Sequence, residues 1–255
     1  MAGGFGAQLI TALIVNYLRE SGSKVLVDAS YFSTRYRSNF NKELKYFNYA
    51  LQKETIHINK FERSYFFQKL SRMFFRLSKK VCLKNVYMMD DQSEGKIRFI
   101  LNNMNTIRKN NTFKNVKRIE IGTVPTTDKE VVVHMRRTDF HTAKLEILNI
   151  ETLQRLVKKK YLPFEKSITI VTDDKLGLKK ECDSVNMQDI DVISGDLLDD
   201  IKVGLSAKIL VLSRSQFSIL MLLFSKKVTE VYLPHVFFNE IDKSIPLKVW
   251  DYSKI

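Results

Sequence analysis

The sequence predicts an α/β fold built on a parallel sheet, and two observations lead to this prediction. From residue 130 onward, short apolar runs of strand type alternate strictly with helical segments, and the joints between them are short. Such alternation is typical of a parallel sheet with right-handed crossovers. The chain also contains only 9 glycines and 4 prolines, and so few turn-forming residues argue against an all-β sandwich or barrel.

The chain opens on a glycine-rich loop that leads into a helix. Three glycines lie within the first residues, at Gly3, Gly4 and Gly6. Apolar side chains at helical spacing then predict a helix over residues 7–18, with Gly22 as its C-cap. Residues 24–28 form a short apolar run that ends in an aspartate and predict a buried strand. The predicted order is therefore loop, helix, strand, with no strand ahead of the loop.

The middle of the chain is rich in Lys, Asn and aromatic residues. An amphipathic helix is predicted over residues 61–83, with an aromatic stripe flanked by lysines and arginines. This helix either packs its stripe inward with a solvated basic flank or lies on an anionic membrane surface, and the two interpretations can coexist. Two further strands are predicted, at 97–101 and 117–121.

The C-terminal half has the regular β-α pattern. We expect helices over residues 150–159, 175–182, 197–207 and 216–225. We expect strands over residues 130–135, 167–172, 190–193, 209–212 and 228–233. These elements make a Rossmann-like unit, and we place the domain boundary so that residues 1–128 form one domain and residues 129–255 the other.

The charge balance points to anionic partners. The chain has 42 Lys and Arg against 28 Asp and Glu, a formal net charge of +14, which favours phosphate groups or anionic headgroups. We do not expect nucleic acid as a partner, because the sequence has neither an aromatic-interleaved RNA-binding motif nor a helix-turn-helix. No apolar run is long enough to span a membrane and no basic leader precedes one. With only two cysteines, these features predict a cytoplasmic protein, peripheral on the inner membrane face if residues 61–83 bind lipid.

One polar cluster follows the strand at 130–135. It runs from His134 to Asp139 and contains the adjacent Arg136 and Arg137. In parallel α/β units, ligands bind at the C-terminal ends of strands, and arginine forms bidentate bonds to phosphate. We therefore expect the arginines to converge on a diphosphate. The plainer alternative is a surface arginine pair with an aspartate that caps the next element.

Three other clusters lie at equivalent places. Asp173 and Asp174 end the next strand, where an N-cap for the following helix is the simpler interpretation. Asp200 precedes a strand that is followed by Ser215, at a helix start that could bind an anion or be an ordinary serine cap. The N-terminal glycines could let the backbone approach a ligand. The histidines and cysteines have no spacing suited to zinc, so we predict no metal site.

Taken in order, these clusters resemble the glycosyltransferase family eleven fucosyltransferases, the α-1,2 type of bacterial O-antigen and capsule loci. The family's G-x-G-N-Q loop is similar to residues 4–8, and its H-x-R-R-x-D motif to residues 134–139. Its aspartate followed by S-x-F-S is similar to Asp200 and residues 215–218. Ala7 stands in place of the family's asparagine, and the family's strand before the glycine loop has no counterpart here.

The resemblance implies a GT-B architecture, in which two Rossmann-like domains face each other across a cleft, here with the first strand of the N-terminal domain missing. It implies inverting, metal-independent transfer of fucose from GDP-fucose, with no other cofactor, to a galactoside-type hydroxyl of an oligosaccharide or lipid-linked glycan during surface polysaccharide synthesis. The catalytic residues implied are Arg136 together with Asp139 or Asp28 as the base. The donor-binding residues implied are His134, Arg136, Arg137, Asp173, Asp200, Ser215, Gln216 and Ser218, and the cleft loop contributes Gly4, Gly6 and Gln8.

Three alternatives remain open from the sequence. The same fold could take another nucleotide-sugar. The missing first strand would also fit a non-catalytic relative of the family. The charge of +14 would fit a basic protein that binds nucleic acid.

Overall fold

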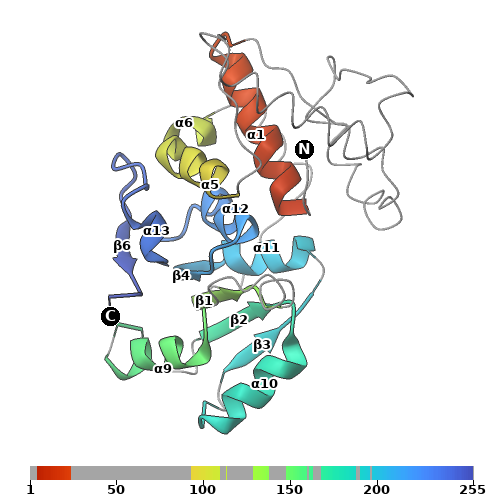
Figure 1. Cartoon of the computed structure of the whole chain (residues 1–255), viewed down its shortest axis with the longest axis vertical. Helices are drawn as coiled ribbons and strands as arrows, with labels where there is room; N and C mark the ends of the chain where they lie inside the picture. Colours follow the sequence, from red (N-terminus) through yellow and green to blue (C-terminus); the bar gives the residue numbers. More distant parts are fainter. Residues whose placement is uncertain are drawn as a thin grey trace, which may run out of the picture. The chain divides into compact units, whose positions relative to one another are not determined.

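The computed structural model describes residues 5–23, 93–109, 113, 129–137, 148–159, 161–162, 168–187, 190–195 and 197–254 (Figure 1). The chain divides into two compact units, residues 1–96 and 97–255. The domain boundary expected at 128/129 stays a prediction, because residues 114–128 lie outside the described residues. The predicted strands at 24–28 and 117–121 and the predicted basic helix at 61–83 also lie outside them.

The helix expected near the N-terminus is confirmed as α1, Phe5–Glu20. Its end is set by Gly22, whose φ of 85° lies in the left-handed region that glycine adopts without strain. The amide of Gly22 donates to the carbonyl of Arg19 and the amide of Ser23 to that of Leu18. This pair of bonds is a Schellman motif, which satisfies carbonyls that a helix end otherwise leaves unpaired.

The strand predicted at 97–101 is wrong, because these residues are helical. They belong to α5, Ser93–Asn102, which is followed by α6, Met104–Lys109. The buried side chains across both helices recur three or four residues apart, at Ile97, Ile100, Leu101, Met104 and Ile107. That is the spacing of one helix face. A window of five residues does not reveal it, and such a short apolar run reads equally well as a strand.

The C-terminal unit is built on a parallel sheet, as predicted. Among the described residues the sheet has six strands: β1 Lys129–Met135, β2 Ile168–Thr172, β3 Asp191–Ile193, β4 Ala207–Leu212, β5 Glu230–Leu233 and β6 Lys248–Asp251. Their order is β3-β2-β1-β4-β5-β6, and each neighbouring pair is parallel. This is the order of the doubly wound, Rossmann-like fold, in which the direction of winding reverses between β1 and β4.

The sequence did not predict β6 or the short helix α13, His235–Phe238, that precedes it. Both elements have only four residues, too few to show a period. The edge strand β6 carries Trp250, whose indole nitrogen donates to the Glu230 carboxylate over 2.6 Å. The strand is therefore held by contacts with β5 that the residues of β6 alone do not predict.

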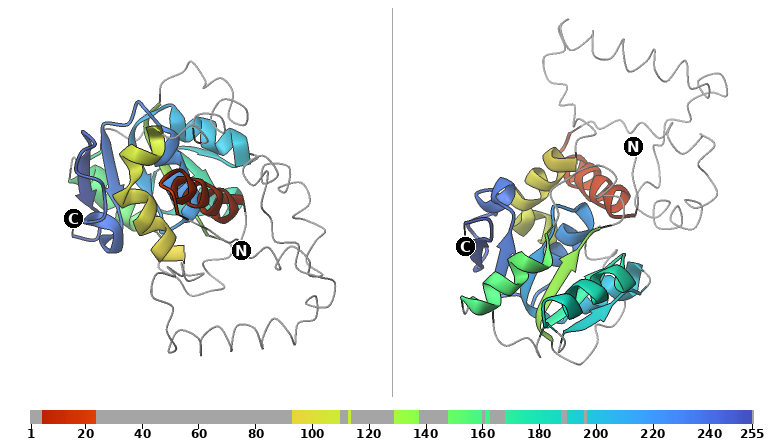
Figure 2. Two further views of the ribbon diagram at one scale, coloured as in Figure 1. Left: turned by 90° about the horizontal axis from the view of Figure 1, so that it is seen from above. Right: turned by 60° about the horizontal axis from the view of Figure 1, so that its bottom comes forward.

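Helices cover both faces of the sheet (Figures 1 and 2). They are α9 Ile150–Lys158, α10 Lys175–Ser184, α11 Leu197–Leu205 and α12 Gln216–Phe224. On one face, Val131 and Val133 of β1 share a core with Leu153 of α9 and Leu178 of α10. Helices α11 and α12 contact β4 and each other. The predicted helices are thus confirmed, although α11 ends earlier than expected because Ala207 begins β4.

Helix α12 is the most deeply buried helix of this unit that the structure describes. Every residue from Phe217 to Phe224 is buried, which fits a helix that is apolar on all sides. Its last carbonyls are satisfied by Arg108 of α6, which donates to Leu222, Leu223 and Ser225 over 2.7–3.0 Å. Arg108 therefore holds the C-terminal end of α12 against α6. None of the helices described is long and apolar enough to cross a bilayer.

Candidate functional site

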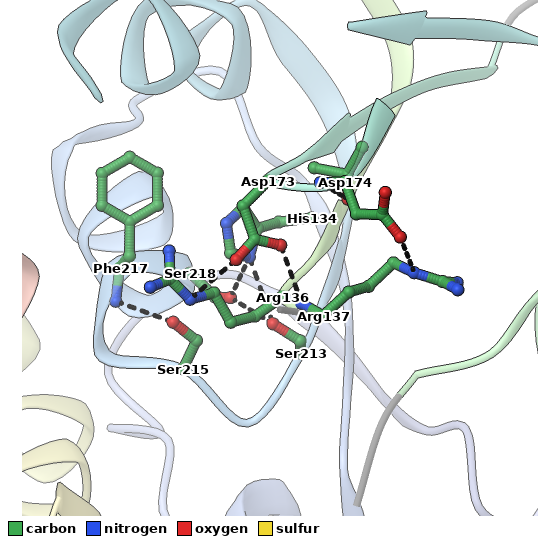
Figure 3. Close-up of polar contacts among 10 residues, drawn as sticks. His134, Arg136, Arg137, Asp173, Asp174, Ser213, Ser215, Phe217 and Ser218 are labelled. Carbon is green, nitrogen blue, oxygen red and sulfur yellow. Dashed lines mark hydrogen bonds and ion pairs between the residues drawn. The ribbon is translucent and has the colours of Figure 1, made fainter. Parts of the chain in front are cut away.

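The side chains at the C-terminal end of β1, and those of the two residues after it, point alternately to the two faces of the sheet. Val133 and Met135 face the core shared with α9 and α10. His134 faces the opposite side, toward Ser213 and Ser218. Because successive side chains of a strand alternate, Arg136 continues the direction of His134 and Arg137 that of Met135. Figure 3 shows the result: the two arginine side chains leave the strand end in opposite directions.

A buried hydrogen-bond triangle joins the ends of β1 and β4. The Nδ1 atom of His134 lies 2.6 Å from Oγ of Ser218 and 3.1 Å from Oγ of Ser213, and the two hydroxyl oxygens are 2.9 Å apart. The amide of Ser213 also donates to the carbonyl of His134. His134 is only 4% exposed. The triangle thus joins the end of β1 to the start of α12 and fixes the turn between β4 and α12.

His134 is held in its neutral form. Its pKa is lowered to about 3, chiefly by burial and also by the nearby charge of Arg136, while the charge of Asp173 opposes this in part. A neutral imidazole accepts a hydrogen bond at one nitrogen and donates at the other. With Nδ1 as the acceptor, one serine hydroxyl donates to it and the second hydroxyl donates to the first.

Arg136 is positioned by Asp173 at the end of β2. Its Nε lies 3.2 Å from Oδ2 of Asp173, and the other carboxylate oxygen accepts the amide of Arg137 over 2.8 Å. The Arg136 side chain is 33% exposed and in Figure 3 runs toward the turn that carries Ser215. Because the ion pair uses Nε, it sets the direction of the side chain. Asp173, predicted to bind the donor, therefore has a direct role in positioning Arg136.

Arg137 has a different environment. Its guanidinium pairs with both carboxylate oxygens of Glu181 on α10, and its Nε lies 3.5 Å from Oδ2 of Asp174. The side chain is only 5% exposed. The hydrogen bond with Glu181 raises its pKa against the effect of burial, so the group stays charged. The expected convergence of both guanidinium groups on one diphosphate is therefore not what the structure shows.

Both capping alternatives are confirmed. Asp174 is the N-cap of α10, and its Oδ1 accepts the amide of Gly177 over 3.0 Å. Ser215 is the N-cap of α12, and its hydroxyl accepts the amide of Phe217 over 3.2 Å. A cap does not prevent Ser215 from lining a site, because the helix it begins lies directly after β4. Gln216 is the first residue of that helix.

Asp200 is in the first turn of α11, the helix that follows β3, and its Oδ1 accepts the amide of Gly195 over 2.9 Å. This hydrogen bond joins the first turn of α11 to the loop that connects β3 to α11. Helix α11 crosses from β3 to β4 and contacts both β1 and β4.

The remaining predicted residues lie in the other compact unit or outside the described residues. Gly6 is in α1, in the other compact unit. Gly4, Asp28 and Asp139 lie outside the described residues, as does the side chain of Gln8. Their proposed roles stay predictions.

Sequence reasoning missed three residues that the structure brings to notice. Glu181 follows Asp174 by seven residues, two helical turns, and so shares a helix face with the cap. His235 comes just after β5, where the rule for strand ends could have identified it. Its partner Asp251 ends β6, so that pair could not be found without the strand. Within the described residues, no group of three His, Cys, Asp or Glu is arranged to hold a metal ion.

Comparison of the chain with models of protein families, with curated proteins and with solved structures finds no match.

Proposed function

We propose that this chain is an inverting, metal-independent glycosyltransferase that transfers fucose from GDP-fucose to a galactoside-type hydroxyl. One observation carries the proposal: Arg136, oriented by Asp173, extends from the end of β1 at the reversal of strand order, next to the β4–α12 turn. In open α/β sheets, nucleotide ligands bind at the C-terminal ends of the strands where the strand order reverses. The order of motifs along the chain, which resembles family eleven fucosyltransferases, supports the choice of donor.

The chemistry of the site suits a diphosphate. A guanidinium stays ionised at any physiological pH and offers paired donors that match phosphate oxygens. The start of α12 adds the partial positive charge of a helix N-terminus and the hydroxyl of Ser215. Glycosyl transfer leaves negative charge on the nucleoside diphosphate, and a preorganised cation lowers the energy of that developing charge. In this proposal Arg136 has that task and Arg137 holds α10 in place.

The two-domain GT-B arrangement is part of the proposal. The Rossmann-like sheet would bind the donor, and the N-terminal part of the chain would bind the acceptor, with Gly4, Gly6 and Gln8 in the cleft. Asp139 and Asp28 remain candidates for the base. Residues 61–83 would bring the enzyme to an anionic membrane that carries a lipid-linked acceptor. The same site would accept a different nucleotide-sugar if its base pocket differs, so the donor needs a direct test.

Binding of GDP to the full chain tests the proposal. We expect isothermal titration to detect GDP and GDP-fucose binding that survives EDTA, and weaker binding of UDP. Arg136→Ala should reduce GDP affinity by about tenfold to a hundredfold, because a charge-assisted pair is lost. The matched control is Arg155→Ala, since Arg155 is an exposed arginine of α9.

Equal GDP affinity in Arg136→Ala and the wild type would contradict the donor site. A protein that binds a short RNA but no nucleoside diphosphate would instead support the nucleic-acid alternative. Release of GDP from GDP-fucose, with lactose as the galactoside, then tests transfer itself.

A further inference from the structure

A second polar pair lies at the same edge of the sheet. His235 follows the end of β5 by two residues, and Asp251 is the last residue of β6, in register with Leu233. The Nδ1 atom of His235 lies 2.6 Å from Oδ2 of Asp251. The strands are parallel neighbours. The pair therefore lies at the end of the sheet where the strands have their C-termini, as does the end of β1. The pair takes no part in the site described above.

The carboxylate of Asp251 is a fixed, ionised acceptor. Its side chain is only 4% exposed, and its Oδ1 accepts both the amide and the hydroxyl of Ser253, over 3.0 and 2.6 Å. Burial raises the pKa of Asp251, but the hydrogen bonds from Ser253 and His235 outweigh burial and hold it below its usual value. The ammonium of Lys254 lies 3.7 Å from Oδ2.

The imidazole of His235 is oriented but exposed. Its ring is held at Nδ1 by the carboxylate, its amide donates to the hydroxyl of Ser253 over 3.1 Å, and its side chain is 60% exposed. An ionised carboxylate can only accept, so it selects the tautomer with the proton on Nδ1. That leaves the lone pair on Nε2. The carboxylate is thus buried while the ring it holds is exposed.

We propose that His235, in place of Asp139 or Asp28, is the proton acceptor for the hydroxyl that attacks the donor, with Asp251 as its positioning residue; this inference rests on the proposed function. A base held in one orientation by a third group is the arrangement that activates nucleophiles in enzymes. Strand β4 lies between β1 and β5, and strands are about 4.8 Å apart, so the ends of β1 and β5 are about 10 Å apart. Arg136 and His235 therefore follow strand ends on either side of β4.

The proposed step balances as follows. The acceptor oxygen gives its proton to Nε2 of His235 and forms a bond to C1 of the fucose. The bond from C1 to the β-phosphate oxygen breaks, and its electron pair leaves with GDP, whose added charge faces Arg136. The imidazolium that forms is stabilised by Asp251, and it passes its proton to water before the next cycle.

The test measures GDP affinity and turnover separately in the full chain. Turnover is GDP release from GDP-fucose with lactose as the acceptor. In His235→Gln we expect kcat to fall about 100-fold, the range for loss of a general base, while GDP affinity stays within about twofold of the wild type. Asn239→Ala, an exposed residue at the end of α13, is the matched control and should keep full turnover.

One readout separates a base from a structural role. Added imidazole should partly restore turnover in His235→Ala, which a structural defect would not allow.

The outcomes distinguish the two proposals. If His235→Gln keeps its kcat while GDP still binds, the base assignment is overturned and the donor site stands. If the wild type binds no GDP, or binds it and releases none from GDP-fucose, the proposed function fails and this inference fails with it. Thermal melting of each variant confirms that it is folded.

Discussion

The guanidinium of Arg137 is paired with both carboxylate oxygens of Glu181, two turns along α10 from the helix cap. Arg136, its neighbour in sequence, instead pairs with Asp173 and extends toward the β4–α12 turn. Arg137 therefore joins α10 to the sheet, whereas Arg136 is held by the end of β2. The distinction follows from strand geometry alone, since adjacent residues face opposite sides.

We expect Glu181→Gln to destabilise the protein. The variant leaves the buried charge of Arg137 with only the more distant Asp174. Because Glu181 is partly exposed, water recovers some of the loss, and we expect a cost of about 1–3 kcal/mol in the free energy of unfolding. Urea denaturation measures it, with Asp183→Asn on the exposed side of the same helix as the control. Equal stability of the two variants would remove the structural role of this pair.

Asp173→Asn tests whether the orientation of Arg136 matters for binding. The asparagine side chain keeps an oxygen that can accept a hydrogen bond from the backbone N–H of Arg137. It lacks the negative charge opposite Nε of Arg136. We expect GDP affinity to fall about tenfold, less than in Arg136→Ala, because the cation remains but is less well held. Titration calorimetry gives both values. If Asp173→Asn bound GDP more weakly than Arg136→Ala, Asp173 would have to contact the ligand directly.

We expect the free energy of unfolding to decrease as the pH is lowered, because of His134. Its pKa is 6.5 when unperturbed and about 3 in the fold, chiefly through burial. Between these values the unfolded chain binds a proton that the folded chain does not. Stability from this group is therefore complete above pH 6.5 and is lost as the pH falls toward 3, by an amount on the order of 5 kcal/mol.

His134→Asn isolates this contribution, since its side-chain oxygen can still accept from a serine hydroxyl but does not titrate in this range. Free energies of unfolding, measured in urea from neutral to acid pH, should fall less steeply in the variant than in the wild type. Parallel curves would show that His134 is not the group responsible.

Arg108→Ala should destabilise the end of α12. The substitution removes the donors to the carbonyls of Leu222, Leu223 and Ser225. Hydrogen bonds from a charged group contribute about 1.5–3 kcal/mol, and we expect a loss in that range. Arg108→Lys should recover only part of it, because an ammonium cannot reproduce the planar fork. Denaturation midpoints provide the measurement, and full recovery by lysine would show that charge alone is sufficient.

The sequence was sufficient to predict the sheet because its strands are continuous apolar runs separated by helices, as in Val131–Val133 of β1. It was insufficient for residues 97–101, where the period becomes visible only when Met104 and Ile107 are included. It also missed β6, whose identity depends on Glu230 and Trp250 meeting across two strands.

The candidate site was predictable at the level of strand ends but not in its contacts. The order of β1 and β4 in the sheet places Ser213 and Ser218 next to His134, and strand order is a tertiary property. The opposite directions of Arg136 and Arg137 could have been predicted, since a strand was already expected there and its side chains alternate.

Helix α12 contributes its whole length to the interior, from Phe217 to Phe224. Few of its positions can be changed without opening a void in the core. In the short turn ahead of the helix, Ser213 and Ser215 are buried as well, whereas Arg214 and Gln216 are only partly buried. Under the proposed function, libraries for altering ligand preference are therefore best confined to Arg214 and Gln216.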